Sequence, residues 1–184
     1  MIKLPSVNQL KTFYYPPVID EESVIIQLPD LWDFKKDPSD EGIQDRWFEK
    51  TVDNSWVKIS TSKDWVSQVP GRGYHGVAWY HVSFDFPVEM KKYPGSGLYL
   101  YFGAVDGLAD IYLDGVKIGE QKKEVGVMWD KPFSVPLPLN VDLKNTHHLM
   151  VRVTKDHAAA GIWKQVKIMA MDVSKEKDKP ASTQ

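Results

Sequence analysis

Aromatic residues with polar neighbours are the side chains of this sequence best suited to surface chemistry. The chain of 184 residues holds seven Trp, eight Tyr and seven Phe. A flat ring can pack on the C–H face of a pyranose, while charged groups beside it bind vicinal hydroxyls through paired hydrogen bonds. Three segments combine these features and are expected to bind carbohydrate: Arg72, Tyr74 and His75; Trp129 and Asp130; Asp156, His157 and Trp163. The alternative for each ring is packing in a core.

Clustered carboxylates form a second candidate site. Asp37, Asp40 and Glu41 lie close together just before Gly42, and Ca²⁺ prefers carboxylate and carbonyl oxygens. A structural calcium is therefore the one cofactor that the sequence suggests. The spacing is not that of an EF-hand, and the alternative is a solvated loop that leads into a short helix within residues 40–50, with an acidic first turn.

Other catalytic patterns are missing from the sequence. There is no Cys and no G-x-S-x-G nucleophile elbow. The Gly-rich stretch 71–76 precedes a predicted strand rather than a helix, so we do not expect it to hold a phosphate. His147 and His148 are adjacent, and adjacent residues on a strand point to opposite faces, so the two are not expected to share a metal. The alternative is a turn His followed by a strand His. No acidic pair stands out among the 25 acidic residues.

The charge argues against nucleic-acid and membrane partners. Lys and Arg number 23 against 25 Asp and Glu, a formal net charge of −2, whereas a nucleic-acid binder is normally basic. No apolar run approaches the roughly 20 residues of a membrane span, and the first five residues contain no stretch of secretory-signal length. We expect a cytoplasmic location, or a secreted or periplasmic one if a signal has been trimmed.

Short runs with period-two alternation predict an all-β fold. In the run 77–86, Ala78 and Tyr80 fall on one face, and Trp79 and His81 on the other. Asp114-Gly115 between two apolar runs predicts a type I′ hairpin turn with positive φ at Gly115. About nine strands at sandwich spacing are predicted, at Val24–Leu28, Trp56–Ile59, Val77–Phe86, Leu98–Phe102, Ala109–Leu113, Val116–Ile118, Phe133–Leu137, His148–Thr154 and Ile162–Met169.

The placement of the aromatic residues follows from these strands. Loops of a sandwich gather at its two ends, so we expect four of the candidates to meet at one end: Tyr74, Trp129, His157 and Trp163. If the site lies elsewhere, the sheet face near Tyr99, Tyr101 and Tyr112 is favoured. Trp32 is expected in a loop or at a rim, and Trp47, Trp56 and Trp65 are expected to cap the core.

Five blocks in chain order resemble the sugar-binding domain at the N-terminus of family 2 glycoside hydrolases. Residues 76–87 are similar to its GxxWYxxxFxxP block, and residues 98–115 to its L-x-F-x-x-V-D-x-x-A-x-V-x-x-N-G run, with Asp114 in place of Asn. Pro132-Phe133 resembles the next block, residues 148–153 resemble N-x-L-x-V-x-V, and residues 161–166 resemble GIW-K/R-P-V, with Gln165 in place of Pro. The match runs from about residue 31 to 168.

The resemblance implies a jelly-roll β-sandwich over residues 21–172, between an N-terminal extension (1–20) and a polar tail (173–184). The family's catalytic glutamates lie in another domain, so the resemblance implies a non-catalytic module that binds a poly- or oligosaccharide. The alternative is a structural accessory domain that supports a glycoside hydrolase catalytic domain and binds no sugar. The expected partners are thus carbohydrate and such a catalytic domain.

Overall fold

The computed structural model describes residues 13–14, 24–88, 97–122 and 129–171. These residues form thirteen strands and no α-helix. The strands are β1 (Phe13–Tyr14), β2 (Val24–Gln27), β3 (Leu31–Lys36), β4 (Val57–Ser60), β5 (Gly76–Phe84), β6 (Gly97–Phe102), β7 (Val105–Asp106), β8 (Leu108–Leu113), β9 (Val116–Gln121), β10 (Phe133–Pro136), β11 (His147–Lys155), β12 (Gly161–Ile162) and β13 (Val166–Met171). Three 3₁₀ turns, Trp47–Glu49, Trp65–Ser67 and Val69–Gly71, lie in the connections.

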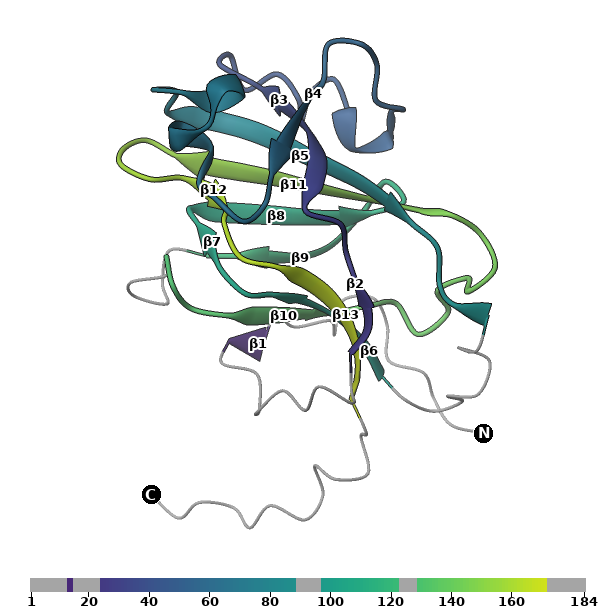
Figure 1. Ribbon diagram of the computed structural model, residues 1–184. Helices are drawn as coiled ribbons and strands as arrows, with labels where there is room; N and C mark the ends of the chain where they lie inside the picture. Colours follow the sequence, from purple (N-terminus) through teal and green to yellow (C-terminus); the bar gives the residue numbers. More distant parts are fainter. Residues whose placement is uncertain (1–12, 15–23, 89–96, 123–128, 172–184) are drawn as a thin grey trace.

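The strands build two stacked sheets (Figure 1). One sheet has five strands in the order β1-β10-β6-β13-β2, and the other has six in the order β4-β3-β5-β11-β8-β9. A two-stranded ribbon, β12-β7, joins them at one end. Every pairing is antiparallel. The predicted all-β jelly-roll sandwich is therefore confirmed.

Each of the nine predicted runs contains a strand, and the run 162–169 overlaps both β12 and β13. Three further strands appear among the described residues: β1 and β7, each of two residues, and β3. Trp32 and Phe34 of β3 face the core, and its Asp33 and Lys35 face outward. The predicted run 162–169 is interrupted at residues 163–165, where β12 ends and β13 has not begun.

The expected short helix within residues 40–50 is wrong. The segment is a series of turns that ends in the 3₁₀ turn Trp47–Glu49. Two positions explain the difference. Arg46 has a left-handed backbone, with φ 54, and the buried Asp37 side chain accepts hydrogen bonds from the backbone N–H groups of Glu41 and Gly42. The left-handed Arg46 interrupts a right-handed helix, and the two Asp37 bonds fix the turn conformation of the residues before it.

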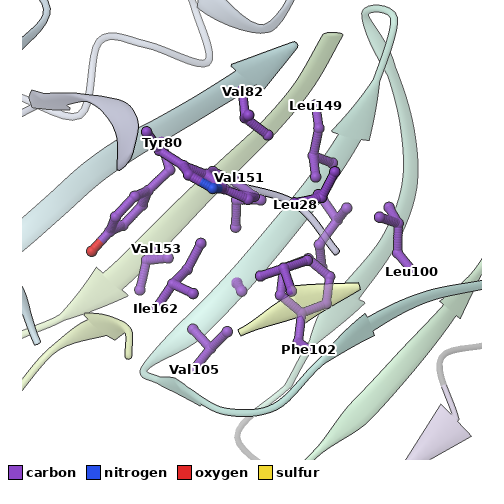
Figure 2. Packing of buried hydrophobic residues seen from close by; sticks show 14 of the residues in the cluster. Leu28, Tyr80, Val82, Leu100, Phe102, Val105, Leu149, Val151, Val153 and Ile162 are labelled. Atoms are coloured by element: carbon purple, nitrogen blue, oxygen red, sulfur yellow. The ribbon is translucent and has the colours of Figure 1, made fainter. Parts of the chain in front are cut away.

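The main core fills the space between the two sheets. Figure 2 shows side chains of β5 and β11 facing those of β6, among them Tyr80, Val151, Leu100 and Phe102. Trp65, which was expected to cap the core, is fully buried in it at 0% exposure. The alternation predicted for β5 is confirmed, because Ala78 and Tyr80 join this core while Trp79 packs in a second cluster.

The second cluster lies on the outer face of the six-stranded sheet. Trp79, Tyr112 and Met150 are buried there under four residues of the segment 37–56, namely Trp47, Phe48, Val52 and Trp56. We call this segment the strap. Phe48 stacks on Tyr112 with ring centroids 4.6 Å apart. The strap thus provides a third partial layer and makes Trp79 and Tyr112 structural residues.

The predicted hairpin at Asp114-Gly115 is confirmed. Leu113 pairs with Val116 across the turn, and Asp114 and Gly115 have φ of 50 and 80. Positive φ at both central residues is the type I′ signature. Asp and Asn adopt this conformation more readily than most residues, and the Asp114 carboxylate accepts hydrogen bonds from the His148 N–H and the His147 ring on the adjacent strand.

Candidate functional site

Strand register explains which loops meet at the end of the five-stranded sheet. Phe102, the last residue of β6, pairs with both Phe133 at the start of β10 and Val166 at the start of β13. The residues just before Phe133, just after Phe102 and just before Val166 therefore lie at one edge. This edge carries Trp129 and Trp163, and we call it the platform end.

Trp129 and Trp163 form a stacked pair at the platform end. Their ring centroids are 5.7 Å apart, with 21° between the planes. Trp163 is held by its neighbours: its indole N–H donates to the Trp129 carbonyl, its backbone N–H donates to the Ala104 carbonyl at 3.4 Å, and the Lys164 ammonium lies 4.5 Å from its ring centroid. Trp129 remains 49% exposed. One indole thus supports another whose surface is open to solvent.

Tyr74 lies elsewhere, against the core. Its hydroxyl donates to the Val77 carbonyl at 2.6 Å, and its carbonyl accepts from the indole N–H of Trp65 at 2.8 Å. Burial raises the pKa of the Tyr74 hydroxyl. Trp65 also donates its backbone N–H to Ala160, so Tyr74 is linked to the strand end near β12. No hydrogen bond or ring contact among the described residues joins it to the Trp129–Trp163 pair.

The remaining candidates differ in exposure. Arg72, His75, Asp156 and His157 are exposed, and Asp130 is half-buried. His157 bonds to the neighbouring Asp156, and this hydrogen bond lowers the pKa of the Asp156 carboxyl. Gly76 at the start of β5 pairs with Lys155 at the end of β11, so the loop 72–75 and the segment 156–160 adjoin the same end of the six-stranded sheet. The structure thus gathers these loops but brings only Trp129 and Trp163 into ring contact.

Asp37, Asp40 and Glu41 do not converge. Both Asp37 oxygens accept N–H donors, from Glu41 at 2.8 Å, Gly42 at 2.9 Å and the Trp79 indole at 3.0 Å. Asp40 pairs with Arg152 at 2.7 Å, and Glu41 is exposed. The described part of the chain contains no group of three or more His, Asp or Glu side chains placed to hold a metal ion. The calcium stays a prediction, and ligation by Asp37 would compete with three hydrogen bonds.

Two expectations about aromatic residues are wrong. Trp32 is fully buried in β3, where its ring meets Tyr80 edge-on at 6.4 Å. Tyr112 belongs to the six-stranded sheet and lies under the strap, whereas Tyr99 and Tyr101 belong to the five-stranded sheet. The three tyrosines therefore share no face. Trp47 and Trp56 cover the outer face through Trp79 rather than the main core.

Sequence reasoning missed a polar chain on the same outer face. The buried His81 ring bonds to Asp33 through Nδ1 at 3.0 Å and to His148 through Nε2 at 3.2 Å. Lys58 pairs with the same Asp33 at 2.7 Å. Burial lowers the pKa of His81, against the opposing effect of Asp33. As predicted, His147 and His148 point apart: His147 bonds to Asp114 instead. This chain was missed because the sequence did not predict β3, whose Asp33 pairs with His81 across the strands.

Comparison with known proteins gives the fold a context. No family model matches the chain, and no curated protein matches it. Among solved structures, a β-glucuronidase from an uncultured Clostridium species matches 88% of this chain with a TM-score of 0.70 and 22% identity, over 31% of its own length. The apo β-glucuronidase of Ruminococcus gnavus matches 86% with a TM-score of 0.69 and 16% identity, also over 31% of its length.

The chain therefore spans about a third of the length of these enzymes. At such identities the likeness establishes a shared fold, and the fold implied by the five sequence blocks is confirmed. No helix in the described residues is long and apolar enough to cross a membrane.

Proposed function

We propose that this chain is a non-catalytic carbohydrate-binding domain associated with a glycoside hydrolase. The observation that carries the proposal is the stacked Trp129–Trp163 pair at a loop end, with Trp129 49% exposed. Adjoining aromatic rings at the surface are typical of contact sites, where Trp and Tyr are enriched. The shared fold with part of two β-glucuronidases supports the association with glycoside hydrolases.

Trp129 and Trp163 have different roles in the proposed site. Trp129 offers its surface to a pyranose, and the half-buried Trp163 holds it through the ring stack and the indole hydrogen bond. Asp130, next to Trp129, and Lys164, beside Trp163, supply the polar groups for sugar hydroxyls. Arg72, His75, Asp156 and His157 belong to neighbouring loops and would contact only a longer ligand.

The second candidate function is that of a structural accessory domain. Its support is the length of the matched enzymes: this fold occupies 31% of each β-glucuronidase chain and accompanies a much longer remainder. In this case Trp129 would pack against another domain. A glycan array and affinity gels with plant, algal and host polysaccharides distinguish the two functions. A carbohydrate-binding domain binds at least one of these ligands, whereas an accessory domain binds none.

Replacing Trp129 or Trp163 with Ala is expected to abolish detectable sugar binding. Loss of one stacking ring costs on the order of 1–3 kcal/mol of binding free energy. If the wild type binds with a Kd of about 1 mM, this loss raises the Kd beyond the range that a titration detects. Titration of any polysaccharide retained by the wild type, by calorimetry, tests this after folding is checked by circular dichroism. Leu139→Ala, which alters a side chain that is 60% exposed elsewhere, is the matched control. Wild-type affinity in both folded Trp variants would place the site elsewhere.

The purified chain is expected to hydrolyse no glycoside. The resemblance places the family's catalytic glutamates outside the matched blocks, and no acidic pair stands out in the sequence as a proton donor and nucleophile. Assays with a panel of nitrophenyl glycosides, glucuronides included, measure this. Steady nitrophenol release that disappears on mutation of one acidic residue would show that the domain is an enzyme.

A further inference from the structure

A pocket of about 460 Å³ lies at the other end of the strands from Lys155 and Gly76. It is bounded by the β8–β9 hairpin and by the connection from β10 to β11. His147, which begins β11 and pairs with Phe84 at the end of β5, forms part of its wall. Its size is typical of a pocket for a small ligand or a single side chain.

The floor of this pocket is aliphatic. Leu113 and Ile118 are buried, and Val116 is 54% exposed; Pro138 and Val141 complete the surface. No aromatic ring other than the His147 imidazole is among the described lining residues. Such a floor suits a flexible hydrocarbon chain, which gains by leaving water, and it offers no Trp, Tyr or Phe ring on which a sugar could stack.

The rim accepts hydrogen bonds. Asp142 receives the Lys144 N–H at 2.9 Å and the Asn145 amide at 2.7 Å, which fixes both residues and leaves lone pairs on each Asp142 oxygen. Asp114 is fixed in the same way by His147 and His148 and also keeps free lone pairs. Both His147 ring nitrogens and the Thr146 hydroxyl already bond to protein oxygens.

The carboxylates of the lining come from Asp114 and Asp142, and neither Lys nor Arg is among the described lining residues. The His147 ring lies between the Asp114 carboxylate and the Asp142 carbonyl, so Asp142 carries the carboxylate that His147 does not contact. An aliphatic floor below two rigid carboxylates is complementary to an alkyl chain that ends in a positively charged donor. We propose that this pocket binds a primary ammonium group carried on an aliphatic chain, either the side chain of a lysine on a partner protein or a free alkyl diamine.

The test is a titration of the full chain, followed by amide chemical shifts. Cadaverine represents the free diamine, a Gly-Lys-Gly peptide with blocked ends represents the lysine side chain, and pentanol is the uncharged control. We expect saturable shifts confined to residues 113–118 and 138–147 with at least one ammonium probe and not with pentanol. The preferred probe identifies the source of the ammonium group.

Variants connect the shifts to the pocket. Asp142→Asn keeps an oxygen for the Lys144 N–H but removes the charge, and we expect about threefold weaker binding. Val116→Ser, an exposed position that should not disturb folding, is expected to weaken binding through the floor. Asp53→Asn, at an exposed strap residue, is the matched control and leaves binding unchanged. No saturable shifts, equal shifts with pentanol, or unchanged affinity in both pocket variants would overturn the proposal.

Discussion

Gly161→Ala is expected to destabilise the protein by about 3 kcal/mol or more, from strain and overpacking together. A Cβ at this position would lie 2.2 Å from the Tyr80 hydroxyl oxygen and 2.8 Å from Cε3 of Trp65, and the backbone has φ +102. Both neighbours are fully buried, so neither can move aside without disturbing the core. A fall of roughly 10 °C in Tm follows for a chain of this size. Urea unfolding followed by fluorescence measures the change.

Gly73→Ala is the matched control for Gly161→Ala. Gly73 also has a positive φ, +66, but a Cβ there meets nothing within 4 Å. The difference between the two variants therefore combines the overlap with Tyr80 and Trp65 and the greater strain of φ +102 at Gly161. If both variants lose the same free energy of unfolding, the core rearranges around Ala at position 161 without cost, and the expected overlap with Tyr80 and Trp65 is wrong.

Gly161 also connects stability to the candidate site. It pairs with Asp106 in the β12-β7 ribbon and lies two residues before Trp163. A displaced Gly161 would shift Trp163 and with it the ring that supports Trp129. The Gly161→Ala variant, in the fraction that remains folded, should therefore bind polysaccharide more weakly than Gly73→Ala does.

The strands were predictable because alternation is a local signal. Each predicted run holds a strand, since apolar residues on one face must be buried between the sheets. The missed strand β3 shows the limit of that signal. Its sequence LWDFKK contains three charged residues in six, yet the outward Asp33 pairs with Lys58 and His81, and Lys35 lies 4.2 Å from the ring centroid of Trp47. Those partners come from other strands and the strap.

Only part of the candidate site was predicted. Trp163 was expected to meet Trp129 at one end of the sandwich, and it lies half-buried beside Trp129 in the break between β12 and β13. Trp32 and Tyr112 were misjudged because the residues that cover them are distant in sequence: Tyr80 for Trp32, and Phe48 for Tyr112. Whether a ring is exposed depends on long-range packing, which a single sequence does not reveal.

Asp37→Ala is expected to cost about 3 kcal/mol, because it leaves three donors without their acceptor. The Asp37 carboxylate is 2% exposed and accepts from the Glu41 and Gly42 backbone and from the Trp79 indole. The first two bonds shape the start of the strap, and the third joins it to β5. The loss should appear both as a lower free energy of unfolding in urea and as faster hydrogen exchange in residues 41–56.

Asp53→Ala is the matched control for this effect. Asp53 also accepts a backbone N–H, from Ser55 at 2.8 Å, but it is exposed and its bonds are local, so its removal should change stability little. The same pair of variants distinguishes hydrogen bonding from calcium. If Asp37 works through its three donors, a chelator leaves the wild-type Tm unchanged and Asp37→Ala is destabilised equally with and without Ca²⁺. A wild-type Tm that rises with Ca²⁺ and falls with chelator, with no such response in Asp37→Ala, would instead make Asp37 a calcium ligand and show that the donors rearrange to admit the ion.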